Sequence, residues 1–321
     1  MDTKKREMLS DDNDNVCCLN KDHFDKVREA AAYRKEYYPD ETPPLRVWLT
    51  VGGAGRTKGF QTVFKQHQKK NITKFILALL QKCIEYDLYG IDFDNQVFGQ
   101  DDMYHYVAFL NQAVQMFDKY GKKVSITMRP GIWIPSLGTK VVDRVNLMAY
   151  DGPFARLEDN VKPAVKATIQ AGVPPSSIVL GYPAYARNER NPNEVKTFAE
   201  IYYDIEKSKN PQTGKSIDDL SVWDGFVIDS PAAVHEKAQY AKELGLKGIY
   251  MWEVSVSPLY PKAICHHSLS QVRRLLSFQL GQDKQDERFA PSGFLLQSSS
   301  AFADLPDPVH LDDIDKARDE L

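Results

Sequence analysis

Short apolar runs alternate with amphipathic helical patterns along most of the chain. Leu45–Gly52 reads LRVWLTVG, which predicts a buried strand. Phe75–Leu88 carries apolar residues at the three- and four-residue spacing of a helix. The same patterns predict strands at Leu88–Val97, Lys123–Met128, Arg144–Tyr150, Ile178–Tyr182 and Gly248–Trp252, and helices at Met103–Tyr120, Leu157–Ala171 and Pro231–Leu244. This strict alternation predicts an α/β protein with a parallel sheet and helices outside it. The spacing fits a (β/α)8 TIM barrel better than an open sheet.

Both ends of the chain depart from the alternation. Residues 1–44 contain only the apolar run Val16–Leu19 and a helical pattern near Asp22–Tyr37, whereas a complete barrel needs further strands before Leu45. Either the barrel is built without its first one or two strands, or the chain lacks the N-terminal part of the natural protein, which is the interpretation we prefer. We expect an atypical N-terminal segment with a helix (1–44), a barrel (45–280) and a polar, partly disordered C-terminal tail (281–321).

The last four residues resemble a cellular address. Arg318, Asp319, Glu320 and Leu321 are close to the KDEL or HDEL sequence that the ER-retrieval receptor binds, although a chance acidic terminus is the alternative. Residues 1–15 are charged and contain no apolar core, so no signal peptide is visible. We therefore expect the secretory pathway or ER lumen if the N-terminus is incomplete, and the cytoplasm otherwise.

Composition argues against several classes of function. The net charge of −3 gives no general attraction to nucleic acid, and apolar runs such as Phe75–Leu80 are too short for membrane insertion. The four cysteines have no metal-binding spacing, so we predict structural thiols and no metal. The glycine-rich segment Gly52–Gly55 lacks the spacing and lysine of a phosphate-binding loop, so a nucleotide cofactor is not expected.

Polar side chains gather on one face of a predicted strand. Side chains alternate along a strand, so Asp92, Asp94 and Gln96 share one face of the segment YGIDFDNQ. Two carboxylates on the inner face of a barrel repel each other in a poorly solvated place, which is costly for a purely structural purpose. A functional site is therefore preferred over solvated surface charges.

Other strand ends add aromatic rings and charges. Met148–Asp151 places a phenol and a carboxylate just past a strand, Gly181–Arg187 adds two tyrosines and an arginine, and Tyr250–Glu253 adds an indole. The carboxyl ends of barrel strands meet at the face where barrel active sites lie. Aromatic rings stack on pyranose faces, and charged groups bond to hydroxyl and acetamido groups, so the set predicts a sugar site.

These motifs resemble glycoside hydrolase family 18, the chitinases and chitinase-like lectins, which are (β/α)8 barrels. The family's strand-four signature DGxDxDxE is matched by Tyr89–Gln96, its SxGG element by Thr50–Gly53 and its MxYD element by Met148–Asp151. The strand-seven pattern GxPxYxR fits Gly181–Arg187, and the strand-eight tryptophan fits Trp252. The motifs follow the family's order over residues 45–258.

The resemblance implies a substrate, a mechanism and site residues. In this family the 2-acetamido oxygen of the sugar attacks the anomeric carbon while a strand-four glutamic acid protonates the leaving oxygen. The implied partner is an oligosaccharide or polysaccharide containing N-acetylglucosamine. The implied catalytic positions are Asp92, Asp94, Gln96, Tyr150 and Asp151, and the implied sugar-binding positions are Gly53, Met148, Tyr185, Arg187 and Trp252.

One departure bears on the mechanism. Gln96 occupies the position of the family's general acid, and an amide has no proton to transfer near neutral pH. The signature also begins with Tyr89 in place of an acidic residue, and Asn95 stands at a place that is often aromatic. Changes at two fixed positions of one motif, those of Tyr89 and Gln96, indicate drift away from catalysis.

Three hypotheses of function follow. The preferred one is a catalytically inactive, chitinase-like protein that binds chitin or chito-oligosaccharides. The second is weak hydrolysis of chitin through another acid, such as Glu253 or a protonated aspartic acid. The third is a degenerate barrel that acts as an interaction scaffold.

Overall fold

The computed structural model describes residues 46–53, 59–60, 69–96, 100–130, 134, 142–151, 156–207, 220–252 and 295–298, and positions 25, 27–29, 32 and 36. The chain forms two compact units. Unit 1 has the bounds Met1–Met128, Trp133–Val145 and Ser292–Leu321, and unit 2 has the bounds Arg129–Ile132 and Asn146–Pro291. The described positions from 25 to 36 are helical. The other residues before 46, nearly all of the expected tail and the terminal Arg318–Leu321 lie outside the described residues.

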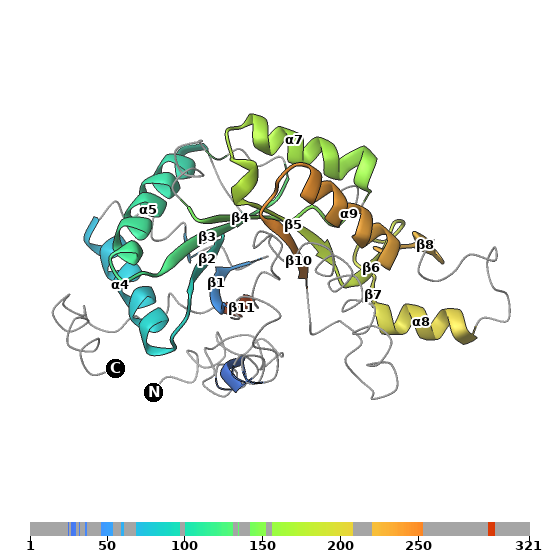
Figure 1. Cartoon of the computed structure of the whole chain (residues 1–321), viewed down its shortest axis with the longest axis horizontal. Helices are drawn as coiled ribbons and strands as arrows, with labels where there is room; N and C mark the ends of the chain where they lie inside the picture. The colour runs from blue at the N-terminus through green and yellow to red at the C-terminus, as the bar shows by residue number, and fades with distance from the viewer. Residues whose placement is uncertain are drawn as a thin grey trace. The chain divides into compact units, whose positions relative to one another are not determined.

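Unit 1 contains a parallel sheet whose strands lie in the order β3–β2–β1–β11 (Figure 1). The strands are β1 (Trp48–Gly52), β2 (Gly90–Asp94), β3 (Lys123–Met128) and β11 (Leu295–Ser298). The first three were predicted, with β3 at the expected bounds. Strand β11 pairs in parallel with β1 and was missed, because it falls in the segment interpreted as a polar tail.

Helices α4 (Lys69–Glu85) and α5 (Gln100–Asp118) lie side by side on one face of this sheet (Figure 1). The packing follows from the alternation of side chains, since Ile91 and Phe93 are fully buried on the opposite side of β2 from Asp92. The Phe93 and Phe109 rings meet edge to face with centroids 4.8 Å apart. Both helices begin a few residues before their predicted starts.

A buried thiol belongs to this core. Cys83 is a free cysteine on α4, and burial raises the pKa of its thiol to about 12. A thiol with so high a pKa is a structural group and a poor nucleophile. The other cysteines, Cys17, Cys18 and Cys265, lie outside the described residues.

Unit 2 carries the later strands and helices of the alternating pattern. Strand β5 (Ile178–Pro183) pairs in parallel with β10 (Gly248–Trp252), and strands of a parallel sheet were predicted at both places. Strand β4 (Arg144–Leu147) crosses the boundary between the units and ends before the predicted Tyr150. The helices are α7 (Lys162–Gln170), preceded by a π-helical turn at Leu157–Val161, and α9 (Pro231–Glu243). Ser230 caps α9 by accepting a hydrogen bond from the Ala233 amide, and proline fits the next position.

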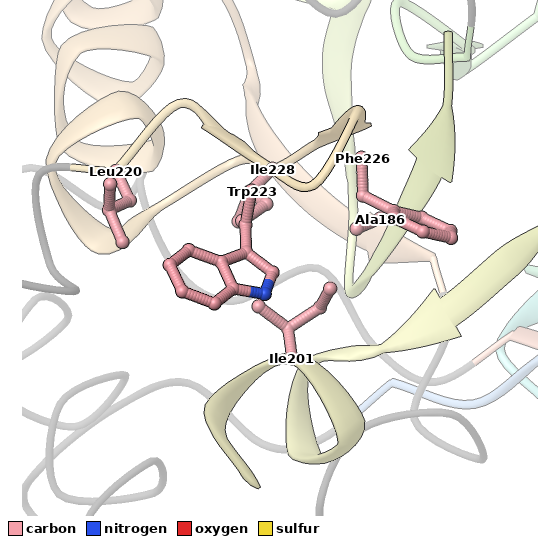
Figure 2. Close-up of a cluster of buried hydrophobic side chains, with 6 residues drawn as sticks. All are labelled: Ala186, Ile201, Leu220, Trp223, Phe226 and Ile228. Carbon is pink, nitrogen blue, oxygen red and sulfur yellow. The ribbon is translucent and has the colours of Figure 1, made fainter. Parts of the chain in front are cut away.

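A small α+β subdomain follows β5, and the sequence patterns did not predict it. Its antiparallel sheet has the order β7–β6–β9–β8, formed by β6 (Tyr185–Asn188), β7 (Val195–Thr197), β8 (Val222–Trp223) and β9 (Phe226–Val227), with α8 (Phe198–Lys207) beside it. These strands are too short for a periodic signal. Figure 2 shows the buried cluster that joins the sheet to α8, consisting of Ala186, Ile201, Leu220, Trp223, Phe226 and Ile228. Among the described residues, no helix is long and apolar enough to span a bilayer.

Candidate functional site

The carboxylate of Asp92 lies at the centre of a row of hydroxyl groups in unit 1. The strand register places Thr50 and Ser125 on either side of Asp92, and Thr127 beside Asp94. Asp92 is fully buried and accepts hydrogen bonds from Ser125 Oγ at 2.5 Å, Thr127 Oγ1 at 2.7 Å and Thr50 Oγ1 at 3.4 Å. The carboxylate is therefore held by donors from both neighbouring strands.

Burial and hydrogen bonding act on Asp92 in opposite directions. Burial raises the pKa of Asp92 above its usual value, while the hydroxyl bonds and the charge of Arg144 lower it, and burial outweighs them. The Tyr106 hydroxyl donates to the Phe93 carbonyl oxygen at 3.4 Å. Burial, followed by the charges of Asp92 and Asp94, raises the pKa of Tyr106 well above its usual value.

The raised pKa of Asp92 predicts a pH-dependent stability. A carboxyl group whose pKa is higher in the folded state contributes stability below its unfolded pKa of about 3.9, and this stability is lost as the pH rises through the folded pKa. Asp92→Asn removes this titration. We expect the unfolding free energy of the wild type to fall relative to Asp92→Asn by up to about 1.4 kcal/mol per pH unit over this range, measured by urea denaturation.

The exposed Asp159 provides the control, because Asp159→Asn removes a carboxylate from the surface. If Asp92→Asn and Asp159→Asn have the same stability profile relative to the wild type, the raised pKa of Asp92 is refuted.

Asp94 and Gln96 form a close pair at the end of β2. The Nε2 atom of Gln96 donates to both carboxylate oxygens of Asp94 at 3.0 Å, which agrees with the prediction that the two side chains share a face. The Gly53 amide donates to the Asp94 carbonyl oxygen at 2.9 Å. Gly52 and Gly53 have φ of +109° and +113°, a backbone conformation that favours glycine. The two glycines therefore allow the end of β1 to approach Asp94 closely enough for this hydrogen bond.

Asp151 is held by two residues of the subdomain in unit 2. Tyr185 Oη donates to Asp151 Oδ1 at 2.6 Å, and Arg187 donates through Nε to Oδ1 at 2.9 Å and through Nη2 to Oδ2 at 3.2 Å. Asp151 has φ of +68°, an unusual value for a residue other than glycine. Burial, followed by the bond to Asp151, raises the pKa of Tyr185. These bonds fix a strained residue four positions after the end of β4, and such strain is common in functional sites.

Tyrosines and a tryptophan form a second cluster in unit 2. Met148, Tyr150, Val179 and Tyr250 are buried together, and the partly exposed Trp252 packs against them. Tyr250 Oη donates to Tyr150 Oη at 3.4 Å. Gly181 makes room for these rings, because a Cβ atom there would lie 2.6 Å from Tyr150 and 2.7 Å from Tyr250.

The predicted site residues therefore form clusters within each unit. Unit 1 contains Gly53, Asp92, Asp94 and Gln96, and unit 2 contains Met148, Tyr150, Asp151, Tyr185, Arg187 and Trp252. The alternative acid Glu253 lies outside the described residues. Sequence analysis missed the hydroxyl donors Ser125 and Thr127, although they alternate along β3 in the same way as the acids of β2.

The chemistry of the clusters suits a polar organic ligand. Carboxylates, hydroxyls and an amide provide hydrogen bonds, and the indole and phenol rings provide stacking surface. Among the described residues, no group of three or more His, Cys, Asp or Glu could hold a metal ion.

A protein-family model and known proteins match much of the chain. The model described as glycosyl hydrolases family 18 matches residues 4–256, so most of the N-terminal segment that we set apart falls inside the match. Endochitinase 1 of Metarhizium robertsii is 24% identical in an alignment of 279 residues that covers 68% of this chain and 63% of that protein. The class V chitinase CHIT5 of Lotus japonicus is 23% identical in an alignment of 271 residues that covers 66% of this chain and 67% of that protein. The chain thus spans about two thirds or less of the length of these curated relatives.

Solved structures show the same fold. A class V chitinase from Nicotiana tobaccum, a glutamate-to-glutamine mutant in complex with NAG4, has a TM-score of 0.61 at 19% identity, covering 74% of this chain and 83% of its own. A chitinase-like agglutinin from Robinia pseudoacacia has a TM-score of 0.60 at 18% identity, and the match covers 78% of this chain and 87% of the agglutinin chain. These likenesses confirm the predicted (β/α)8-barrel architecture.

Proposed function

This chain belongs to glycoside hydrolase family 18, and we propose that it binds glycans containing N-acetylglucosamine without hydrolysing them. The observation that carries the proposal is the pair formed by Gln96 and Asp94. An amide stands within 3.0 Å of both Asp94 oxygens, at the position that the sequence motif assigns to the family's general acid. General-acid catalysis contributes about 10²–10⁴-fold to a rate, and an amide cannot supply it.

By the family resemblance, each unit retains groups that would hold an acetamido sugar. In unit 1, Asp94 provides an acceptor and the Gln96 amide a donor, and in unit 2, Asp151 provides an acceptor and the Tyr150 and Trp252 rings provide stacking surface. Binding requires hydrogen bonds and stacking alone, so loss of the acid removes turnover and leaves affinity. The tobacco glutamine mutant in complex with NAG4 and the chitinase-like agglutinin support this combination.

Weak hydrolysis is the second candidate. The observation that favours it is the raised pKa of Asp92, because a protonated carboxyl is the chemical species that a general acid requires. Complete burial and three hydroxyl partners argue against proton delivery from Asp92 to a substrate.

A paired measurement on one sample tests the proposal. Calorimetric titration with a chitin oligomer should show binding, while a fluorogenic chitobioside should show no hydrolysis above background. Hydrolysis by the unmodified protein would establish the second candidate. Absence of both binding and hydrolysis would leave the scaffold hypothesis.

Trp252→Ala is expected to weaken binding of the chitin oligomer by about tenfold or more, which corresponds to roughly 1.4 kcal/mol. The reason is that Trp252 is partly exposed beside Tyr150 and Tyr250, so its ring can stack on a sugar. Calorimetry measures the change in affinity.

Tyr203→Ala is the matched control, because it removes an aromatic ring that is 52% exposed on α8 of the same unit. An equal loss of affinity in both variants, or no loss in Trp252→Ala, would show that Trp252 does not stack on a sugar.

A further inference from the structure

A ladder of aromatic rings and guanidinium groups lies in unit 1, in which the two rings are tilted by 60° to one another. The guanidinium carbon of Arg46 is 4.6 Å from the centroid of the Tyr89 ring, and the Tyr89 and Trp48 centroids are 5.2 Å apart. The guanidinium carbon of Arg144 is 4.4 Å from the centroid of the Trp48 ring. Tyr89, at the signature position where the family has an acidic residue, thus provides the ring between Arg46 and Trp48.

The Arg144 end of this ladder is buried. Arg144 is 5% exposed and Trp48 is 3% exposed, so the guanidinium of Arg144 is largely removed from water. A desolvated cation–π contact is favourable, but burying a charge costs more than such a contact contributes unless a counter-charge is close. Stacking on Trp48 alone therefore does not explain a guanidinium at this place.

Asp92 provides the opposite charge. Among the described residues, the groups that act on its carboxylate come from four neighbouring elements: the hydroxyls of Thr50 on β1 and of Ser125 and Thr127 on β3, the phenol of Tyr106 on α5, and the charge of Arg144 on β4. Asp94 on the same strand adds a second negative charge to this region. Arg144 is the cation in this set, and its charge favours the ionised form of Asp92.

We propose that Arg144 is a positioning residue that acts through Asp92. Its guanidinium, held on the Trp48 ring, favours the ionised form of the Asp92 carboxylate in a place where burial favours the neutral acid. A charged Asp92 accepts hydrogen bonds from three hydroxyls, whereas a protonated one has to use one oxygen as a donor and loses part of this arrangement. Arg144 thereby fixes the hydroxyl row beside Asp94. The inference does not depend on glycan binding.

The titration of Asp92 tests this directly. In the full-length protein with 13C-labelled aspartate, Arg144→Gln is expected to raise the titration midpoint of the Asp92 carboxyl carbon by about one pH unit or more. Arg144→Lys should recover part of the shift, because it keeps the charge without the planar stacking group. The control is Arg156→Gln, which breaks the exposed ion pair with Glu189 and should leave the midpoint unchanged. An unchanged midpoint in Arg144→Gln overturns the proposal.

A double-mutant cycle measures the coupling between Arg144 and Asp92 if Arg144→Gln is too unstable for the titration. The loss of stability caused by Arg144→Gln at pH 7 should shrink severalfold when Asp92 is already asparagine, because no buried carboxylate then needs the cation. Urea midpoints give both values. An equal loss in the two backgrounds would mean that Arg144 acts through packing alone, and the proposal would be wrong.

Discussion

Replacing Gln96 by glutamate is expected to raise hydrolysis of a fluorogenic chitobioside by about 10²–10⁴-fold over the unmodified protein. The Gln96 amide lies 3.0 Å from both carboxylate oxygens of Asp94, so a glutamate there places a second carboxyl beside the first. Two carboxylates at this distance cannot both ionise easily, and one of them keeps a proton towards neutral pH. The substitution therefore supplies the proton that an amide lacks.

Gln112→Glu is the matched control for this gain. Gln112 lies on α5 and donates to Thr73 Oγ1 at 2.6 Å, so the control makes the same chemical change between two helices. The control should show the background rate of the unmodified protein. If Gln96→Glu binds the chitin oligomer and still does not hydrolyse the chitobioside, the assignment of position 96 to the general acid is wrong. If neither protein binds, the sugar site itself is lost.

The alternation of side chains explains why much of the fold and of the site could be predicted. A strand with Asp92 and Asp94 on one side and Ile91 and Phe93 on the other has only one sensible orientation in a parallel sheet covered by helices. The same rule placed Gln96 on the same face as Asp94. The motifs assigned Asp151, Tyr185 and Arg187 to the candidate sugar site, and in the structure Tyr185 and Arg187 bind the Asp151 carboxylate.

The features that were missed depend on contacts between distant segments. The strands of the subdomain have two to four residues each, which is too short for a period to be visible. Strand β11 is recognised by its pairing with β1, since its sequence lies in a polar region. Likewise, the contact between Arg144 and Trp48 joins residues that are far apart in the sequence, and no local pattern predicts it.

The stability of the site depends on how the polar row is packed as well as on its charges. Gly52 ends β1 opposite Asp94, and Gly90 begins β2 opposite Lys123. A Cβ atom at Gly90 would lie 2.2 Å from the Lys123 carbonyl oxygen, so β2 is closely approached at both ends. The acids of β2 are therefore placed by backbone contacts that only glycine allows.

Gly52→Ala is expected to lower the unfolding free energy by about 2–5 kcal/mol, which adds the cost of a left-handed backbone to that of overpacking. Gly52 has φ of +109°, and a Cβ atom there would lie 2.3 Å from the Asp94 carbonyl oxygen.

Gly121→Ala is the matched control, because Gly121 has φ of +65° and no atom within 4 Å of its Cβ position. Only the backbone cost of about 1–2 kcal/mol therefore remains in this variant. Urea denaturation measures both losses, and their difference reports mainly the close approach of Gly52 to Asp94 and, at 3.0 Å, to the Phe60 ring. Since relief of this contact has to move Asp94, Gly52→Ala should also lose affinity for a chitin oligomer, whereas Gly121→Ala should keep it. Equal losses of stability in the two variants would show that the approach of β1 to Asp94 does not hold the site together.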